Sequence, residues 1–514
     1  MKRLLALALA LAMSLSLAAC GGGGETQNTG TETNTGTETG TTGETRDDLT
    51  VILGADFTTL DPQKLPAVAD INFCTNIFDG LVALNEDNEV VPMLATDWEP
   101  SEDGLHYTFH LREGVKFHNG NDFTADDVKL SVERFRDQSW MQFASFAVDS
   151  CDIVDDYTVT INLKYAYGNF INMLWYCAII DSDYYNSVSE EEFARNPVGT
   201  GPFKFVEWTP AQHITLAANE DYWDGAPAMK EITFNFISDV NTALIAMETG
   251  QADMVFGTAL SATTFLQAQE NEDLATDSTV GNSFYFVNFN SDRISKEVRQ
   301  ALSYAIDREV INVMVNEGTG YVGDIPLVEG QEGYTTDITT YEYDPDKAKE
   351  LLAAAGAEGL TLTFFYGESA DNTKLGQSLQ SQFANVGVNL ELQPVESGTW
   401  WATFGDGDYD ISRGGYPMEA ANTDSCYYDM FHSTGTFNVS RISNPEIDAL
   451  LDEARVSLDS ERRNEIYIQV NQILSEEAYY IPLYFSASML VYNPDLQGAH
   501  AVSTQNYQYK DLSW

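Results

Sequence analysis

The sequence predicts an α/β protein with more than one lobe, and three observations support this prediction. The chain has 514 residues, whereas a single hydrophobic core rarely grows past roughly 250–300 residues before the chain divides. Residues 105–111 alternate apolar and polar side chains, the pattern of a half-buried strand. Residues 298–306 instead repeat apolar side chains at helical spacing. Strands and helices in one chain of this length favour an α/β architecture.

Residues 1–20 have the pattern of a secretory signal. Lys2 and Arg3 precede an apolar run that ends at Leu17, and two alanines and Cys20 follow. The run is shorter than the roughly twenty residues that a membrane-spanning helix needs. Residues 17–20 resemble a bacterial lipobox, which implies that Cys20 becomes the acylated first residue of the mature protein. We therefore expect export and a lipid anchor on the outer face of the cell membrane.

Residues 21–48 are expected to form a disordered tether. They are rich in Gly, Thr and Glu, and the six residues 28–33 are repeated immediately at 34–39. A segment of this composition cannot bury enough apolar surface to offset its chain entropy. By random-coil scaling it would have a root-mean-square span of about 30 Å.

The charge of the chain excludes one class of partner. Lys and Arg total 26 against 79 Asp and Glu, which gives a formal net charge of −53. Such a chain should repel nucleic acid, whose binding depends on neutralising phosphates. The 43% content of hydrophobic residues nevertheless indicates a packed body behind an acidic, solvated surface.

The packed body is predicted to begin with a strand over residues 49–53, followed by a turn at 59–62. Two later helices carry start signals. Asp344 and Asn444 are each suitable N-cap residues, and each is followed by a proline at the first helical position. The first of these helices is expected to end near Gly356.

Two motifs suggest cofactor or metal chemistry, but neither has the required context. Residues 318–323 match G-x-G-x-x-G, yet they follow a predicted helix, whereas a dinucleotide fingerprint follows a strand. His106 and His110 lie on a predicted strand, where a four-residue spacing separates them by about 13 Å. We interpret the first as a Gly-rich loop, and the second cannot form one zinc site.

The remaining chemical signals also favour a protein that is not an enzyme and needs no cofactor. Residues 406–410 contain three aspartates, but Ile411 stands where an EF-hand loop needs glycine and Pro417 stands where it needs glutamate, so a charged turn that leads into a strand is preferred. No G-x-S-x-G elbow is present, although a triad dispersed in the sequence remains open. The cysteines after Cys20 allow three disulfide pairings or free thiols, and the sequence does not rank these alternatives; they are Cys74, Cys151, Cys177 and Cys426.

Four ordered blocks of the body resemble extracellular solute-binding proteins of family 5, the oligopeptide, dipeptide and nickel binders of ABC importers. The first block covers 94–128 and includes YTFHLREGVKFHNG at 107–120. The second comprises NPVGTGPF at 196–203, NEDYWDG at 219–225 and GQAD at 250–253. The third lies at 298–308 and the fourth at 343–356. Together they cover almost everything after the tether.

The resemblance implies a two-lobed, type II periplasmic-binding-protein-like fold. Two crossover strands would join lobes that close on the ligand. By similarity the first lobe takes residues 49–283 and the returning stretch 484–514, with an extra subdomain inserted at about 84–190. The second lobe takes 284–483.

The resemblance also implies a ligand site. Arg413 corresponds to an arginine of oligopeptide binders, Tyr416 stands where they usually have tryptophan, and Glu419 stands where they have the aspartate that meets a peptide's α-ammonium. A peptide would pair as an extended strand with backbone near Gly281, Asn282 and Ser283, at one hinge, and with the segment after Arg413. For Glu419 a solvated surface position remains open, Tyr416 could stack on the ligand or pack in the lobe wall, and Arg413 could instead form a structural ion pair.

The predicted function is the substrate-binding component of an ABC importer that captures short peptides. The expected partners are the peptide, the permease subunits and, through the lipid anchor, the membrane; we expect a monomer and no nucleic acid. The alternatives are a nickel complex, haem or an oligosaccharide as ligand, or a role as ligand sensor. The sequence leaves ligand identity, length and affinity, and the identity of the permease, open.

Overall fold

A computed structural model describes residues 46–65, 70, 73–85, 89–138, 141–396, 404, 407–418 and 422–514. These residues belong to one compact unit, Arg46–Trp514. The predicted signal, Cys20 and nearly all of the predicted tether lie outside the described residues, as do Glu419, Trp400 and Trp401. None of the helices in the described residues is long and apolar enough to cross a membrane.

One large mixed sheet runs through the unit. Eleven strands of the described residues belong to it, in the order β15-β14-β16-β12-β17-β11-β1-β10-β9-β8, with β13 paired to β17. The strands are β1 (Asp48–Leu53), β8 (Phe203–Thr209), β9 (His213–Ala218), β10 (Glu231–Phe236), β11 (Met254–Phe256), β12 (Ala275–Phe289), β13 (Tyr321–Val322), β14 (Thr361–Gly367), β15 (Asn389–Val395), β16 (Ile411–Pro417) and β17 (Tyr480–Tyr492).

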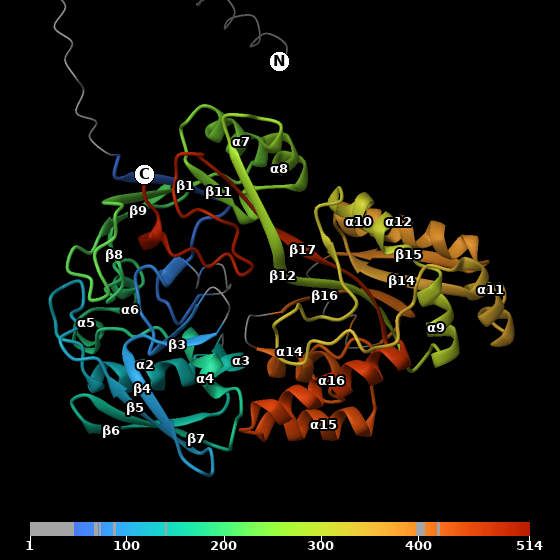
Figure 1. The fold of residues 1–514 in the computed structure, drawn as a ribbon, viewed down its shortest axis with the longest axis horizontal. Coiled ribbons are helices and arrows are strands. Elements are labelled where there is room, and N and C mark those ends of the chain that lie inside the picture. Colours follow the sequence, from blue (N-terminus) through green and yellow to red (C-terminus); the bar gives the residue numbers. More distant parts are fainter. Residues whose placement is uncertain are drawn as a thin grey trace, which may run out of the picture. The chain divides into compact units, whose positions relative to one another are not determined.

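Two long antiparallel strands, β12 and β17, connect the two halves of this sheet (Figure 1). The first part of β12, residues 275–280, pairs with β17 next to β11. Its last part, residues 284–289, pairs with β17 on one side and with β16 on the other. These two strands are the crossover strands of a two-lobed fold, as predicted. We refer to β1 and β8–β11 with their helices as the first lobe, and to β14–β16 with α9–α16 as the second lobe.

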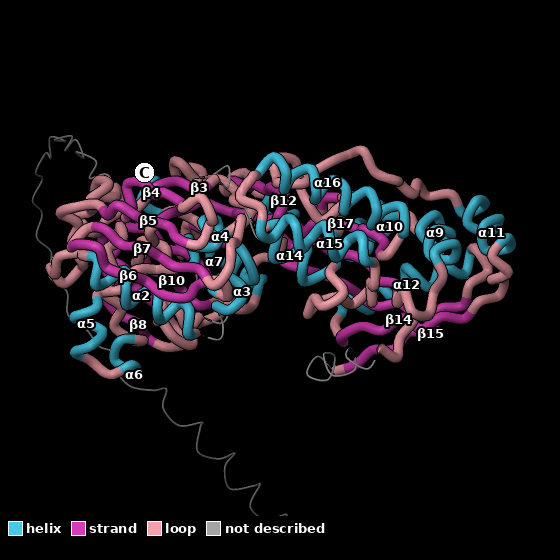
Figure 2. Tube along the Cα trace, turned by 90° about the horizontal axis from the view of Figure 1, so that it is seen from below, coloured by secondary structure: helices cyan, strands magenta, loops and turns pink. Residues whose placement is uncertain are grey.

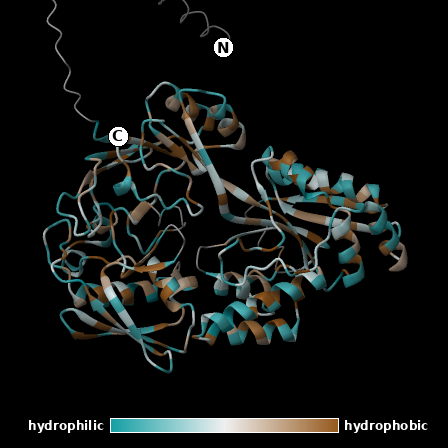
Figure 3. Ribbon diagram, in the orientation of Figure 1, coloured by the Kyte–Doolittle hydropathy of each residue, from teal (hydrophilic) through white to brown (hydrophobic). Residues whose placement is uncertain are grey.

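The second lobe has helices on both faces of its sheet (Figure 2). Successive residues of β12 point to opposite faces: Tyr285 and Val287 pack with α9–α12, whereas Phe284 and Phe286 pack with α14–α16. These helices carry both hydrophobic and hydrophilic residues, since each has one face on the sheet (Figure 3). They are α9 (Lys296–Tyr304), α10 (Arg308–Asn316), α11 (Pro345–Ala354), α12 (Ala370–Asn385), α14 (Thr423–Phe431), α15 (Pro445–Val456) and α16 (Ser460–Glu477).

The first lobe contains a large core and a smaller one. The large core includes Leu49, Val51, Phe234 and Leu512, so the chain's C-terminal stretch packs with its first strand. The smaller core lies under α7 and α8. The helical segments of this lobe are α5 (Ser182–Ser187), α6 (Glu190–Phe193), α7 (Val240–Glu248), α8 (Ala262–Gln269), η3 (Gly257–Ala259) and η4 (Tyr509–Asp511).

A four-stranded antiparallel sheet, β4-β5-β7-β6, forms the extra subdomain of the first lobe. On β5, Tyr107 and Phe109 are buried while His106 and His110 are exposed, which confirms the predicted strand. The segments here are β2 (Val82–Leu84), β3 (Val90–Pro92), β4 (Ala95–Pro100), β5 (His106–Leu111), β6 (Val148–Asp155), β7 (Thr158–Leu163), α2 (Ala125–Asp137), α3 (Gln142–Ser145), α4 (Phe170–Met173) and η2 (Leu174–Tyr176).

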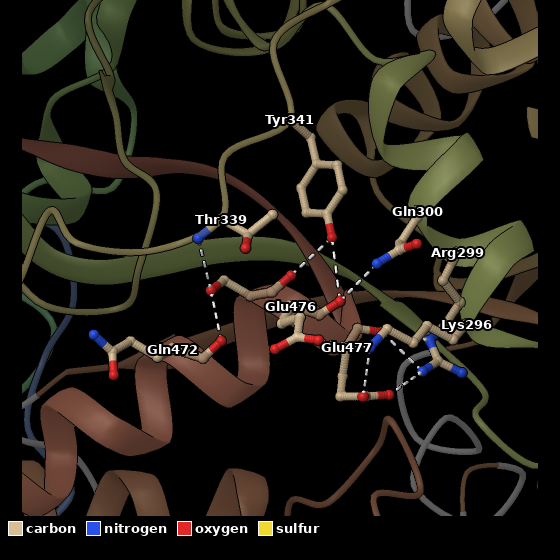
Figure 4. A network of polar contacts seen from close by, with 9 residues as sticks. Lys296, Arg299, Gln300, Thr339, Tyr341, Gln472, Glu476 and Glu477 are labelled. Atoms are coloured by element: carbon tan, nitrogen blue, oxygen red, sulfur yellow. Dashed lines mark hydrogen bonds and ion pairs between the residues drawn. The ribbon is translucent and has the colours of Figure 1, made fainter.

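The C-terminal end of α16, just before crossover strand β17, is held by a polar network (Figure 4). Arg299 of α9 donates to the carbonyl oxygens of Glu477 and Ala478, at 2.8 and 3.2 Å. Lys296 pairs with the Glu477 carboxylate at 2.8 Å, and Tyr341 donates to the Ser475 carbonyl at 2.9 Å. Cations and donors at a helix C-terminus satisfy its unpaired carbonyls. The network therefore fixes where β17 begins.

The subdomain contacts the second lobe through polar and charged groups. The backbone N–H of Gly168 donates to the Arg455 carbonyl at 2.9 Å, and Asn169 donates to Asn422 at 3.2 Å. Beside them, Asp424 is 2% exposed and accepts from the Arg455 guanidinium at 3.1 and 3.2 Å. Burial raises the pKa of Asp424, and the charge of Arg455 opposes that rise.

Several local predictions are confirmed. Asp344 and Asn444 cap α11 and α15 with their side chains, and a proline opens each helix. The Gly-rich residues 318–323 follow α10 and contain the short strand β13, so they do not open a helix. Among the described residues all four cysteines are buried free thiols: Cys74, Cys151, Cys177 and Cys426.

Candidate ligand-binding site

The predicted hinge residues lie at an irregularity of β12. Val280 is opposite Ala487 and Phe284 is opposite Phe485, so Gly281, Asn282 and Ser283 together face the single residue Ser486. Such a bulge bends a strand and leaves part of its ladder unpaired. Gly281 is buried, and a Cβ at that position would lie 2.7 Å from the Ser486 carbonyl oxygen. The chain therefore needs glycine where the two strands approach most closely.

Arg413 lies on β16 opposite Val287, with its guanidinium 4.6 Å from the centre of the Tyr285 ring. Tyr285 in turn packs against Tyr484 across the strands, at 5.2 Å between ring centres. Burial raises the pKa of Tyr484 to about 12, so this tyrosine is neutral. Among the described residues no carboxylate pairs with Arg413, which is half-buried. Its hydrogen-bond donors remain available to an acceptor.

Tyr416 occupies the other face of the same strand. Its hydroxyl donates to Asp429 at 3.1 Å, and its ring packs edge-on against Phe437 at 5.0 Å. Burial raises the pKa of Tyr416 well above its usual value. Because side chains alternate along a strand, Tyr416 and Arg413 point in opposite directions. The structure thus places Tyr416 in the wall of the second lobe and does not bring its side chain to that of Arg413.

A cavity with a mainly apolar wall lies in the first lobe, and sequence reasoning missed it. It has a volume of about 290 Å³ and lies between the β2–β3 hairpin, η2 and the C-terminal stretch 506–510. Arg112 stacks over the Trp223 ring at 4.2 Å, and Lys510 pairs with Asp224 at 2.6 Å. Both cations belong to the cavity wall.

Two buried polar atoms of residues in this wall have no hydrogen-bond partner among the described residues: the indole nitrogen of Trp175 and the hydroxyl of Tyr176. The residues are 7% and 1% exposed. Buried polar groups in folded proteins are nearly always hydrogen-bonded, so this unpaired pair is unusual. Neither atom has surface open to the cavity, so the pair belongs to the packed wall and not to the surface that a ligand would contact. No sequence signal marked these residues, because they lie in a short helical turn without periodicity.

Within the described residues, His, Cys, Asp and Glu side chains form no group of three or more that could hold a metal ion. Arg413, the hinge segment and the cavity instead provide hydrogen-bond donors, aromatic rings and backbone. This arrangement suits an organic ligand with polar groups.

The fold and these sites define a two-lobed, type II substrate-binding protein, not an enzyme. The chain belongs to the bacterial extracellular solute-binding proteins of family 5, whose model for the middle region matches residues 89–438. Members of this family bind solutes for ABC permeases.

Curated relatives cover most of the chain. The heme-binding protein A of Haemophilus influenzae is 28% identical over 467 residues, which cover 82% of this chain and 84% of that protein. The glutathione-binding protein GsiB of Salmonella paratyphi A is 27% identical over 484 residues, which cover 90% of this chain and 94% of that protein.

Solved structures share the fold over nearly the whole chain. The ABC transporter substrate-binding protein CtaP of Listeria monocytogenes has a TM-score of 0.82 at 25% identity, covering 91% of this chain and 99% of that one. The periplasmic binding protein DppA of Helicobacter pylori, in complex with the peptide STSA, has a TM-score of 0.75 at 27% identity, covering 91% and 98%.

Proposed function

We propose that this substrate-binding protein captures short peptides and delivers them to the permease of an ABC importer. The observation that carries the proposal is the cavity of about 290 Å³ whose wall combines aromatic rings, among them Trp175 and Trp223, with the cationic side chains of Arg112 and Lys510. A peptide supplies carbonyl and carboxylate oxygens that can accept from these donors. The relatives that bind glutathione, itself a tripeptide, and the peptide STSA support the same ligand class.

The proposal assigns roles to the residues expected from the sequence. Arg413 binds a main-chain carbonyl or the terminal carboxylate, because its guanidinium has an aromatic neighbour but no carboxylate among the described residues. The backbone at the β12 bulge, residues 281–283, pairs with the peptide through the groups left unpaired after the Asn282 carbonyl accepts from the Met418 N–H at 2.6 Å. Glu419 meets the α-ammonium, and Tyr416 supports the wall.

Native mass spectrometry of the purified protein, combined with calorimetry of a panel of peptides, tests the proposal. We expect co-purifying masses of short peptides, and a loss of about tenfold or more in affinity in Arg112→Met, which removes the guanidinium donor from the cavity wall. Arg462→Met, on the exposed side of α16, is the matched control and should bind as the wild type does. Binding of haem, nickel complexes or oligosaccharides without peptide binding would overturn the peptide assignment.

Export and anchoring complete the proposal. Residues 1–19 are removed, Cys20 becomes the first residue and carries the acyl chains, and residues 21–48 tether the body to the outer face of the membrane. The intact mass of the membrane-extracted protein checks this directly. A mass that retains residues 1–19, or a Cys20 without acyl chains, contradicts it.

A further inference from the structure

A second, smaller cavity lies at the carboxyl ends of two first-lobe strands. It has a volume of about 110 Å³ and is bordered by Leu53 and Gly54 after β1 and by Phe256 at the end of β11. β1 and β11 are parallel neighbours in the sheet. In open α/β sheets, ligands bind in the crevice outside the carboxyl ends of such strands. This position therefore favours a ligand-binding role.

Residues 505–510 separate the two cavities. Gln505, Tyr507 and Tyr509 line the smaller cavity, whereas residues 506, 508 and 510 line the larger one. Alternate residues of this stretch, which leads into η4, therefore contribute to different cavities, so one stretch of chain forms a wall of both. The smaller cavity is below the range of about 300–1,000 Å³ that holds a whole small-molecule ligand. It is suited to one group of a larger ligand.

The smaller cavity contains a carboxylate without a partner. No described residue donates a hydrogen bond to the side chain of Asp70 or forms an ion pair with it. Burial alone raises its pKa to about 6. Other buried aspartates of the first lobe are paired: Asp61 with Arg134 at 2.8 Å, and Asp79 with three donors. Asp70 is thus an exception that the protein's own groups do not satisfy.

The rest of the wall is aromatic. Phe57 and Phe73 pack with ring centres 4.5 Å apart, and Phe256 and Tyr507 with ring centres 4.4 Å apart. Aromatic faces attract cations, and a half-buried carboxylate binds an ammonium through a short charge-assisted hydrogen bond. A cationic group would offset the cost of withdrawing Asp70 from water. No lysine, arginine or histidine is among the residues that line this cavity.

We propose that the Asp70 cavity is a subsite for a positively charged amine of the transported ligand. This inference rests on the proposed function, because the amine belongs to the captured peptide. It also fits the net charge of −53, which draws cationic solutes toward the protein. The amine is a lysine side chain of the peptide or, in place of the role proposed above for Glu419, the peptide's α-ammonium; the two groups share the same chemistry.

The subsite has a defined pH dependence. The other titratable groups around Asp70 are Cys74, Tyr507 and Tyr509, whose pKa values burial raises, so they stay neutral near pH 7. A proton and the ligand amine compete for the Asp70 carboxylate. Affinity for amine ligands should therefore be constant above pH 6 and fall as the pH drops below it, by up to about tenfold per unit.

Calorimetry with matched tripeptides tests the subsite. The peptides are Ala-Lys-Ala, its norleucine analogue Ala-Nle-Ala, and the N-acetylated form of each, measured at pH 7.5 and pH 5 with the wild type, Asp70→Asn and Asp221→Asn. Asp221 is an exposed aspartate of the same lobe and is the matched control. In the wild type and in Asp221→Asn we expect the peptide that carries the recognised amine to bind at least about tenfold more tightly than the matched peptide that lacks this amine. Asp70→Asn should lose this preference and its pH dependence.

The outcomes are separable. If the affinity of the wild type falls when lysine is replaced by norleucine, the bound group is the side-chain ammonium. If it falls when the peptide is N-acetylated, the bound group is the α-ammonium. Peptides that bind with an unchanged amine preference in Asp70→Asn overturn the subsite and leave the proposed function intact. Where no peptide binds, the proposed function fails, and n-butylammonium against n-butanol is the remaining probe of the same variants. Equal thermal stabilisation of wild type and Asp70→Asn by n-butylammonium then overturns the subsite as well.

Discussion

Asp424 and Asp70 are both withdrawn from solvent, but their surroundings differ. Asp424, where the subdomain meets the second lobe, accepts from two nitrogens of Arg455 and from the Tyr467 hydroxyl at 3.4 Å. Asp70, at the carboxyl end of β1, has aromatic neighbours and no donor among the described residues. Burial raises the pKa of both carboxyls. Only the first has a cation of its own chain to oppose that rise.

The difference separates structural charge from charge available to a ligand. A buried carboxylate with a full set of partners fixes the geometry around it, because removing one partner leaves an uncompensated charge. A buried carboxylate without partners destabilises the folded protein, and a cationic ligand that pairs with it can remove this destabilisation. Asp79 lies between these extremes, since it is fully buried and has three neutral donors, from Thr200, Tyr222 and Trp223.

The largest expected effect on stability comes from removing the cation that pairs with Asp424, which leaves this carboxylate without a charged partner, as Asp70 is among the described residues. Arg455→Met keeps the apolar stem but removes the guanidinium that pairs with Asp424 and stacks 3.4 Å above Tyr428. We expect the free energy of unfolding to fall by about 3–5 kcal/mol, measured by denaturant titration. Arg462→Met is the control, because its partners Glu453 and Glu465 are exposed and such pairs contribute about 0–1 kcal/mol. Equal effects of the two substitutions would contradict the comparison.

A smaller effect is expected at Asp79. Tyr222→Phe removes the hydroxyl that donates to Asp79 at 3.1 Å and keeps the packing of the ring. Losing a hydrogen bond to a buried charged group should reduce stability by about 1.5–3 kcal/mol. Tyr184→Phe is the control, since its hydroxyl donates to the neutral carbonyl of Asn196 at 2.9 Å and should contribute about 0.5–1.5 kcal/mol. Thermal unfolding at pH 7 distinguishes them, and a larger loss in the control argues against charge as the cause.

The fold was largely predictable from the sequence, because its signals are local or belong to a family. Alternation over 105–111 gave β5, and the N-caps Asp344 and Asn444 marked two helix starts. The crossover strands followed from resemblance, which also placed a hinge at residues 281–283; the bulge that the structure shows there was not predicted. The wall formed by residues 505–510 was not predictable, because it requires the end of the chain to pack beside its beginning.

The candidate site was predictable only in part. Arg413 was singled out and is unpaired among the described residues, whereas Tyr416 faces the opposite side of β16. Trp175, Tyr176 and Asp70 carried no signal, because nothing in a sequence says that a buried polar group lacks a partner. Whether a polar group has a partner depends on all the residues that pack around it, and most of these are distant in the sequence. Sequence reasoning therefore finds residues that match the ligand-binding positions of known relatives. It does not find polar groups that the fold leaves without a hydrogen-bond partner.

The smallest expected effect has the opposite sign and a pH signature. The pKa of Asp70 is about 6 in the folded protein against 3.8 for an unperturbed aspartate, so the native state binds its proton more tightly than the unfolded state does. Stability contributed by this group is present below about pH 4 and is lost as the pH rises through 6. Asp70→Asn should therefore have a higher free energy of unfolding than the wild type at pH 7.5, by roughly 1 kcal/mol after allowance for solvent screening of a half-exposed carboxyl. Thermal unfolding measures the difference as a higher melting temperature. The difference should shrink as the pH falls and vanish at about pH 3 and below, where the carboxyl is mostly protonated in both states. Asp221→Asn, an exposed control, should show neither the gain nor its pH dependence. A gain at pH 7.5 that persists at pH 3 would mean that Asp70 is not a buried, unpaired charge.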